Sequence, residues 1–447
     1  MERSKSELVF IPSLGIGHLV STIEFANLLL ERSERLSITV LVMDAGNDIK
    51  TKLASHTNIR FIQLPYVESN KTCVKEAIVK HVLPNSSKLL GLVIDLFCTS
   101  MIDVGNELGV PSYLFFTGGA AGLGFLLYLP HRHDLKGREF EESEFESELI
   151  IPGYLNPIPV DALPGFLFNK ERYMPFVNLV RRFKETKGIL VNSFLDLEPH
   201  VVSSLISAYH DLPPVYTVGP LINHKNQNTV QSKNHEEIMK WLDEQPESSV
   251  VFLCFGSGGC FGVPQLKEIA LGLEKSGHRF LWSIRVASED KKKIENIDHK
   301  AILPKGFLER TKGKGFTCGW APQVEVLAHK AVGGFVSHCG WNSILESLWF
   351  GVPILTWPLY AEQTLNALKM VKELGLAFEL KLDSKIFSDE IVKGDEIAKA
   401  VKCLMEEDSE VRKRVRDMSV KGRKALIASG SSYDSVGHWI ETILGGS

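Results

Sequence analysis

The sequence has no extended basic run and no long apolar tract, and its cysteines follow no known spacing. Lys and Arg (50) nearly balance Asp and Glu (54), so electrostatics give no reason to expect a nucleic-acid partner. The longest nearly uncharged stretch, residues 117–130, is too short and too rich in glycine for stable membrane insertion. Seven scattered cysteines include no CxxC pair, which argues against a zinc site and a disulfide framework. We therefore expect a cytoplasmic protein.

The length and the hydrophobic pattern predict two α/β domains. A chain of 447 residues exceeds what a single hydrophobic core usually supports. Short β-branched and aromatic runs alternate with helix-period segments in both halves, which is typical of parallel sheets covered on both faces. The polar stretch 223–235 is the expected linker between an N-terminal domain (1–225) and a C-terminal domain (236–430). Residues 431–447 are expected to form a helix that packs back on the N-terminal domain.

Ligands of open parallel sheets bind at the carboxyl ends of the strands. Two doubly wound domains therefore predict a central cleft, with functional residues on the loops that follow strands in both halves.

The first candidates follow apolar strands in the N-terminal half. Gly15, Gly17 and His18 form a glycine-rich turn into a helix, where His18 is placed to act as a base. A helix-capping histidine, or half of a dinucleotide fingerprint with Val20 in place of the third glycine, would explain the same motif. Asp95 ends another apolar run, where a carboxylate is costly unless it is hydrated or paired. A His18–Asp95 couple is plausible, with a loop-capping aspartate as the alternative.

The C-terminal half carries polar and aromatic residues at several strand exits within a short span. Ser257 lies in a glycine-rich loop that suits a phosphate, although no P-loop lysine follows. Trp320 offers a flat face for a nucleobase, and residues 338–343 form a turn into a helix whose N-terminus favours a diphosphate. Glu346 lies one turn further on, within range of a ribose diol, and residues 362–363 suit sugar hydroxyls. Core tryptophans and a buried histidine would not explain so many polar residues at strand exits.

The span 320–363, with WAPQ, HCGWNS, a following Glu, GVP and a closing Glu-Gln pair, resembles the signature box of plant secondary-product UDP-glycosyltransferases of glycosyltransferase family 1. The similarity extends through the chain to GHLV, FGSGG and the terminal GSSYDS. The segment IPGYLNPIPVDALP resembles the branch of this family that acts on phenolics, flavonoids and terpenoids.

This resemblance implies the GT-B fold, with two Rossmann-like domains that bind the acceptor and the UDP-sugar respectively. It implies inverting transfer of glucose from UDP-glucose to a hydroxyl of a small hydrophobic acceptor, giving a β-O-glucoside in plant secondary metabolism. His18 would be the catalytic base and Asp95 its partner. We expect a monomer that needs neither a cofactor nor a metal ion, since no compact Asp-x-Asp cluster lies beside the expected phosphate residues.

The resemblance also assigns the donor site. The residues expected to contact UDP-glucose are Ser257, Trp320, Ala321, Gln323, His338, Gly340, Trp341, Asn342, Ser343, Glu346, Glu362, Gln363 and Thr117. Of these, Trp341, Glu362 and Gln363 would contact the hexose. A closing glutamine is commonly associated with glucose, so Gln363 favours UDP-glucose.

The acceptor side is less defined, because packing in a core would select the same residue types. The hydrophobic and glycine positions expected to line it are Leu14, Gly15, Phe115, Phe116, Leu123, Phe125 and Phe176. The loop around 44–58 looks short for the family, which weakens analogy on this side.

Two other functions compete with glycosyl transfer. A nicotinamide-dependent oxidoreductase is motivated by Gly15, Gly17 and the acid Asp44 after the second strand. A catalytically silent UDP-sugar-binding protein is the other, although an intact His18–Asp95 pair counts against it.

Overall fold

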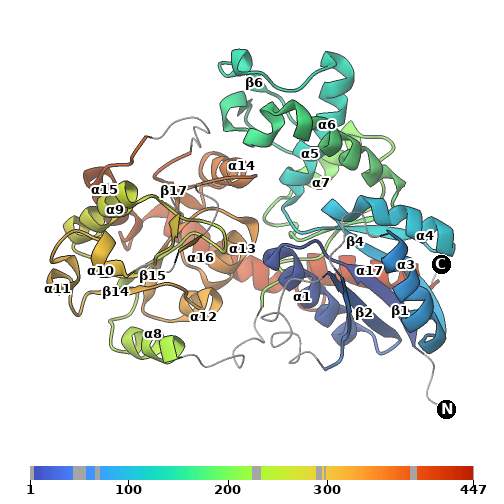
Figure 1. Cartoon of the computed structure of the whole chain (residues 1–447), viewed down its shortest axis with the longest axis horizontal. Coiled ribbons are helices and arrows are strands. Elements are labelled where there is room, and N and C mark those ends of the chain that lie inside the picture. Colours follow the sequence, from blue (N-terminus) through green and yellow to red (C-terminus); the bar gives the residue numbers. More distant parts are fainter. Residues whose placement is uncertain are drawn as a thin grey trace.

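The computed structural model of the chain contains two parallel sheets that follow each other in the sequence (Figure 1). The structure describes residues 5–43, 57–65, 71–223, 233–287, 294–295, 298–382 and 390–445. Most of the expected linker (224–232), Asp44 and most of the short loop (44–56) lie outside the described residues.

The first sheet has seven parallel strands in the order β3-β2-β1-β4-β5-β8-β9. Its central strands are continuous apolar runs because helices cover both faces and leave no strand face to water. The strands are β1 (Ser6–Ile11), β2 (Leu36–Met43), β3 (Arg60–Leu64), β4 (Lys88–Asp95), β5 (Ser112–Phe116), β8 (Ile189–Val191) and β9 (Val215–Thr217).

The second sheet has six parallel strands in the order β14-β11-β10-β15-β16-β17. They are β10 (Val250–Cys254), β11 (Arg279–Ser283), β14 (Gly315–Cys318), β15 (Val332–Ser337), β16 (Ile354–Thr356) and β17 (Ala377–Glu379). Two short antiparallel pairs lie outside the sheets, β6 (Glu148–Leu149) with β7 (Ile158–Pro159) and β12 (Val286–Ala287) with β13 (Ile294–Glu295). The two parallel sheets confirm the predicted pair of Rossmann-like α/β domains.

Helices cover the two sheets. Those of the first domain are α1 (Ile16–Arg32), α3 (Lys71–Ala77), α4 (Ile102–Leu108), α5 (Ala120–Lys136), α6 (Lys170–Arg181) and α7 (Val201–Ala208). Those that follow are α8 (Lys233–Asp243), α9 (Val263–Ser276), α10 (His299–Ile302), α11 (Phe307–Arg310), α12 (Gln323–Ala328), α13 (Trp341–Phe350), α14 (Gln363–Leu368), α15 (Gly394–Leu404), α16 (Glu410–Ala425) and α17 (Ser431–Leu444). Because each sheet is covered on both faces, it lies between two hydrophobic clusters.

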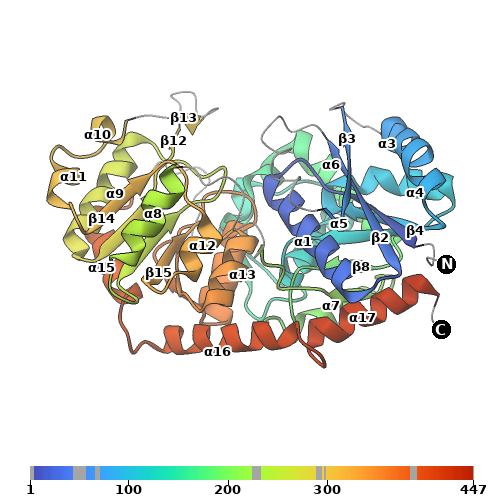
Figure 2. The same ribbon diagram turned by 90° about the horizontal axis from the view of Figure 1, so that it is seen from below.

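The last two helices connect the domains. Figure 2 shows α16 and α17 running one after the other along the lower edge of the molecule, from the second domain to the first. Trp439 of α17 is fully buried, 5.8 Å from the Phe25 ring of α1 and edge-on to Tyr113 of β5 at 5.4 Å between centroids. The C-terminal helix thus packs into the core of the first domain.

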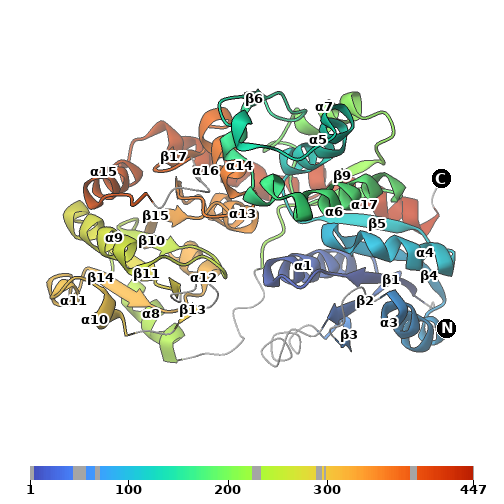
Figure 3. The same cartoon turned by 45° about the horizontal axis from the view of Figure 1, so that its top comes forward.

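A second connection joins α14 to the segment between α5 and α6, as Figure 3 shows near β6. Leu365 of α14 is buried in a hydrophobic cluster whose other members belong to residues 125–177 of the first domain. Beside it, the Glu373 carboxylate accepts hydrogen bonds from the backbone N–H groups of Leu155 (2.8 Å) and Asn156 (3.2 Å). Glu373 also pairs with Lys369 at 3.0 Å, and both side chains are buried.

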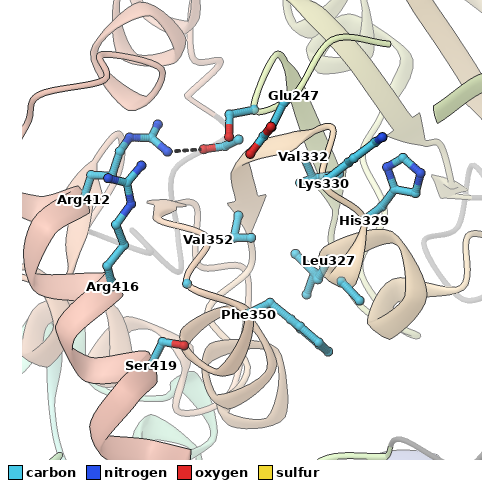
Figure 4. Close-up of a pocket in the computed structure, with 14 residues that line it drawn as sticks. Glu247, Leu327, His329, Lys330, Val332, Phe350, Val352, Arg412, Arg416 and Ser419 are labelled. Carbon is cyan, nitrogen blue, oxygen red and sulfur yellow. Dashed lines mark hydrogen bonds between the residues drawn. The ribbon is translucent and has the colours of Figure 1, made fainter. Parts of the chain in front are cut away.

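A polar pocket of about 310 Å³ lies between the start of β15 and α16 (Figure 4). Its buried Arg412 donates hydrogen bonds to the carbonyl oxygens of Gly333 and Leu404, both at 2.8 Å. This guanidinium therefore anchors α16 to the amino end of β15, opposite to the strand exits.

Candidate active site

The glycine-rich turn after β1 is shaped by the groups that approach it. Gly15 is the N-cap of α1, and a Cβ there would lie 2.9 Å from Cδ2 of His18, too close for any other residue without a shift. A Cβ at Gly17 would lie 3.4 Å from the Nδ2 atom of Asn342, on the other domain. Gly15 therefore makes room for the imidazole, and Gly17 lies where the second domain comes into contact with this turn.

His18 and Asp95 meet at the exits of β1 and β4, which are neighbours in the sheet. The His18 Nδ1 atom lies 2.7 Å from an Asp95 carboxylate oxygen, and the other oxygen accepts the Phe97 N–H at 3.0 Å. Since an ionised carboxylate only accepts hydrogen bonds, Nδ1 carries the proton and Nε2 of the neutral ring is left as the base. The Thr117 hydroxyl lies 3.1 Å from the same Nδ1 atom, so it contacts the base directly.

Charges from both domains act on the imidazole. Burial lowers the pKa of His18, but the hydrogen bond and charge of Asp95, together with the charge of Glu362, outweigh it, so the pKa is raised. Glu362 belongs to the second domain, where it is the N-cap of α14. The Glu362 carboxylate is therefore near enough to His18 to stabilise its protonated form.

The N-terminus of α13 has the features of an anion site. Gly340 is its N-cap and supplies no side-chain hydrogen bond, so the first backbone N–H groups are not capped by it. His338 is buried next to this turn, burial lowers its pKa to about 4, and its Nδ1 atom has no partner among the described residues. A Cβ at Gly256 would lie 2.6 Å from the His338 Nε2 atom, so the loop before Ser257 packs directly on this ring. Ser257 itself is exposed on that loop.

Three of the expected donor residues form one network. The Gln323 side-chain amide donates to the Ser343 hydroxyl at 2.8 Å and to the Glu346 carboxylate at 2.6 Å. Burial raises the pKa of Glu346 to about 7, although the hydrogen bond from Gln323 lowers it. The Trp320 side chain is 52% exposed, so its ring is open to a stacking partner, whereas Ala321 is buried. This arrangement suits a nucleoside, with a flat surface for the base and a carboxylate for a diol.

Two of the residues expected at the donor site form hydrogen bonds with the first domain. The Trp341 indole N–H donates to the Asn192 carbonyl oxygen at 2.7 Å, and its ring packs against Gly119. The side chain is 5% exposed, and its one polar atom is engaged by the first domain. Asn342 donates to the Gly17 carbonyl oxygen and accepts from Ser21, both at 3.2 Å.

The loop before α14 is held by Gln363, whose Oε1 atom accepts the N–H groups of Leu359 (2.9 Å) and Tyr360 (3.0 Å). Ala361 in this loop has φ 54°, and Cys339 at the turn after β15 has φ 63°. Left-handed backbone at residues other than glycine is costly and is enriched at functional sites. Both donor-side turns are thus held in conformations that the surrounding structure must enforce.

The acceptor residues divide into two groups. Phe115 stacks on Phe25 at 5.2 Å in the core beneath α1, and Leu123 and Phe125 are fully buried in other clusters. These three have no surface open to an acceptor, and Phe116 is buried as well.

Three of the expected acceptor residues, Leu14, Gly15 and Phe176, lie where a ligand could reach them. Leu14 is exposed in the turn before α1, and Phe176 is half-buried, 6.4 Å from the ring of Phe97. Phe97 was not expected from the sequence: it is 50% exposed and its ring lies 5.6 Å from that of His18. An exposed aromatic two residues after the acid that ends a strand is the signal that would have identified it.

Within residues 5–445, leaving out the undescribed gaps, no group of three His, Cys, Asp or Glu side chains is arranged to hold a metal ion. None of the helices described combines the length and the apolar character that crossing a membrane requires.

Comparison with known proteins decides the family. The model of the family described as "UDP-glucoronosyl and UDP-glucosyl transferase" matches residues 193–420. The chain is 49% identical to putative UDP-glucose flavonoid 3-O-glucosyltransferase 3 of Fragaria ananassa, over 98% of this chain and 99% of that protein. This chain belongs to the UDP-glycosyltransferase family. It is likewise 48% identical to UDP-glycosyltransferase 71K1 of Malus domestica, over 99% of each chain.

The structures of plant UDP-glycosyltransferases agree with this fold. The structure of Medicago truncatula UGT71G1 complexed with UDP-glucose has a TM-score of 0.89 and 47% identity, covering 98% of each chain. A UGT transferase from Siraitia grosvenorii in complex with UDP has a TM-score of 0.90 and 46% identity, covering 98% of this chain and all of that one. The protein is therefore a plant secondary-product glycosyltransferase with the GT-B fold, and the oxidoreductase interpretation is not favoured.

Proposed function

We propose that this UDP-glycosyltransferase transfers glucose from UDP-glucose to a hydroxyl of a small, flat, hydrophobic acceptor of the flavonoid or related phenolic class, and that the product is a β-O-glucoside. The names of the relatives support the donor and the acceptor class, since several are flavonoid or anthocyanidin 3-O-glucosyltransferases. The observation that carries the mechanism is the 2.7 Å contact between His18 and Asp95, in the electrostatic field of Glu362 from the other domain.

The proposed reaction is a single displacement. His18 Nε2 takes the acceptor hydroxyl proton while the acceptor oxygen forms a bond to the anomeric carbon of UDP-α-glucose. The bond from that carbon to the β-phosphate oxygen breaks, and its electron pair leaves with UDP. Asp95 and Glu362 stabilise the imidazolium that forms, and base catalysis of this kind contributes about 10²–10⁴-fold.

The leaving diphosphate would be stabilised at the N-terminus of α13. Uncapped backbone N–H groups there favour negative charge, and the buried His338 with its unpartnered Nδ1 atom adds a neutral donor. We propose that these groups make a metal ion unnecessary for turnover. Addition of EDTA is expected to leave the rate unchanged, whereas a loss restored by Mg²⁺ or Mn²⁺ would contradict this point.

The acceptor is proposed to lie against exposed aromatic and aliphatic side chains near the base. Phe97 lies 5.6 Å from the His18 ring, Phe176 lies 6.4 Å from Phe97, and Leu14 is exposed in the turn that leads into α1. A flat aromatic acceptor matches such a surface because aromatic rings pack face to face or edge to face over large apolar areas. We further propose that the enzyme acts as a monomer in the cytoplasm.

Incubation with UDP-glucose and a panel of flavonoid, simple phenolic and triterpenoid acceptors, read by mass spectrometry, tests this function. We expect a monoglucosylated flavonoid and slower reaction with the bulky triterpenoid. Binding of UDP in a calorimeter without transfer to any acceptor would instead indicate a silent binding protein. UDP-galactose and UDP-xylose serve as matched donors, and either one outpacing UDP-glucose would contradict the donor assignment.

A further inference from the structure

Two hydrogen bonds link the phosphate side of the site to the helix that carries the base. Asn342 Nδ2 donates to the Gly17 carbonyl oxygen, and the Ser21 hydroxyl donates to Asn342 Oδ1, both at 3.2 Å. Gly17 and Ser21 are four residues apart on α1 and therefore share one face of it. A single side-chain amide thus contacts that face with both its donor and its acceptor.

The Asn342 side chain lies between the helix that carries His18 and the proposed diphosphate site. Gly17 directly precedes His18, and Asn342 is the second residue of α13, whose N-terminus is the proposed diphosphate site. The preceding residue, Trp341, also bonds to the first domain, through the Asn192 carbonyl. Consecutive residues at the start of α13 therefore fix the first domain against the donor site.

We propose that Asn342 is a positioning residue that sets the location of His18 relative to the donor phosphates, with Ser21 as its partner. The inference rests on the proposed function, and it differs from the direct contact with UDP-glucose that the resemblance implied for Asn342. In this structure the oxygen of the amide and one of its N–H groups are engaged by α1, so the side chain acts across the domains.

The physical reason lies in the geometry of the displacement. The anomeric carbon is bonded to the β-phosphate, so anchoring the diphosphate at α13 anchors the reacting carbon as well. The acceptor oxygen must reach that carbon while its proton reaches His18. A displacement of about 1 Å between reacting groups can cost on the order of 10²-fold in rate. A bond between α1 and α13 reduces such displacements without touching the substrate.

A double-mutant cycle tests the bridge. The variants are Ser21→Ala, Asn342→Ala and the double variant, with Thr22→Val as the matched control. Thr22 is the next residue on α1, and its hydroxyl is also buried but has no hydrogen-bond partner among the residues described. The measurements are kcat, the KM for both substrates, and UDP affinity by calorimetry.

We expect Ser21→Ala to lower kcat by about fivefold, the worth of one neutral hydrogen bond, with UDP affinity unchanged within about twofold. Asn342→Ala should lower kcat by at least as much, and the double variant should match Asn342→Ala because both changes break one bridge. Thr22→Val should keep the wild-type kcat. A Ser21→Ala enzyme that behaves like Thr22→Val would overturn the proposal, as would losses that multiply in the double variant.

The same cycle read by thermal unfolding needs no turnover. Non-additive shifts of Tm for Ser21→Ala and Asn342→Ala are expected from a direct bond, and additive shifts would contradict it. If wild-type protein binds UDP but transfers no glucose, the proposed function fails while the unfolding cycle still decides whether the bridge exists. If Asn342→Ala does not fold, Ser21→Ala against Thr22→Val decides the question.

Discussion

Replacement of Asp95 by asparagine removes one charge from the centre of the site with little change in shape. The Asp95 carboxylate is fully buried, holds the His18 Nδ1–H at 2.7 Å and accepts the Phe97 N–H at 3.0 Å. Asparagine can still accept from Phe97, but its amide N–H₂ would then face His18 and donate to Nδ1. That favours the tautomer in which Nε2 carries the proton, and this tautomer cannot act as the base. Loss of such a carboxylate costs up to about 10⁴-fold in triad enzymes, so we expect kcat/KM to fall by about 10²–10⁴-fold.

The Asp95→Asn substitution should also shift the pH dependence of the rate to lower pH. Burial lowers the pKa of His18, and Asp95 and Glu362 raise it more, so in the wild type the pKa lies above the usual 6.5. A base acts when unprotonated, so the wild-type rate should rise with pH through that raised pKa. In Asp95→Asn the burial remains while the main opposing charge is gone, so the rise moves to lower pH and the loss is largest on the alkaline plateau.

The assay is initial-rate kinetics with UDP-glucose and a flavonoid from about pH 5 to 9, the range across which histidine titrates. Asp103→Asn is the matched control, because this carboxylate pairs with Lys71 and Arg182 at the surface of the first domain. UDP affinity should be unchanged in both variants. A plateau within about threefold of wild type, or a rise displaced to higher pH, would refute the reasoning.

Three further predictions follow from single contacts. Because burial raises the pKa of Glu346 to about 7, UDP affinity should fall by up to about tenfold per unit as pH drops below 7, and Glu346→Gln should abolish that dependence in calorimetry. If UDP affinity depended on pH in Glu346→Gln as it does in the wild type, Glu346 would be excluded as the carboxylate that binds the ribose hydroxyls. Glu373→Gln leaves Lys369 buried without its counter-charge, so thermal or urea unfolding should show a loss of about 3 kcal/mol, and a neutral result would mean that the backbone contacts of Glu373 suffice. Gly119→Ala places a Cβ 2.7 Å from the Trp341 ring, so kcat should fall by about tenfold or more while folding is retained. A wild-type kcat in Gly119→Ala would show that this interdomain contact tolerates movement.

The sheets and the central pair of the site follow from local pattern. Apolar runs that alternate with amphipathic helices determine parallel sheets, and adjacent strands bring their exits together whatever their separation in sequence. His18 and Asp95 are 77 residues apart, yet Asp95 ends β4 and His18 lies in the first turn of the helix that follows the neighbouring β1, so the two meet. By the same rule, the sequence predicts His338, Ser343 and the pair Glu362–Gln363 at the strand exits of the second sheet.

The remaining details depend on contacts between distant segments. Successive strand residues point to opposite faces, but both faces of β5 are buried, so no pattern distinguishes Phe115 from Phe116. Phe115 faces a core that is complete only once Trp439 and its neighbours in the C-terminal helix pack onto the first domain. Trp341 and Asn342 likewise bond to residues of the other domain, and the sequence carries no signal for how the two domains dock.

The stereochemistry and base dependence of the product test the central claim most directly. Wild-type protein and His18→Ala are incubated with UDP-α-glucose and a flavonoid, UDP affinity is confirmed by calorimetry, and the anomeric coupling of the product is read by NMR. We expect a β-glucoside from the wild type and a loss of at least about 10²-fold in the variant, with UDP affinity retained. An α-glucoside, or a variant that transfers glucose at the wild-type rate, would contradict it.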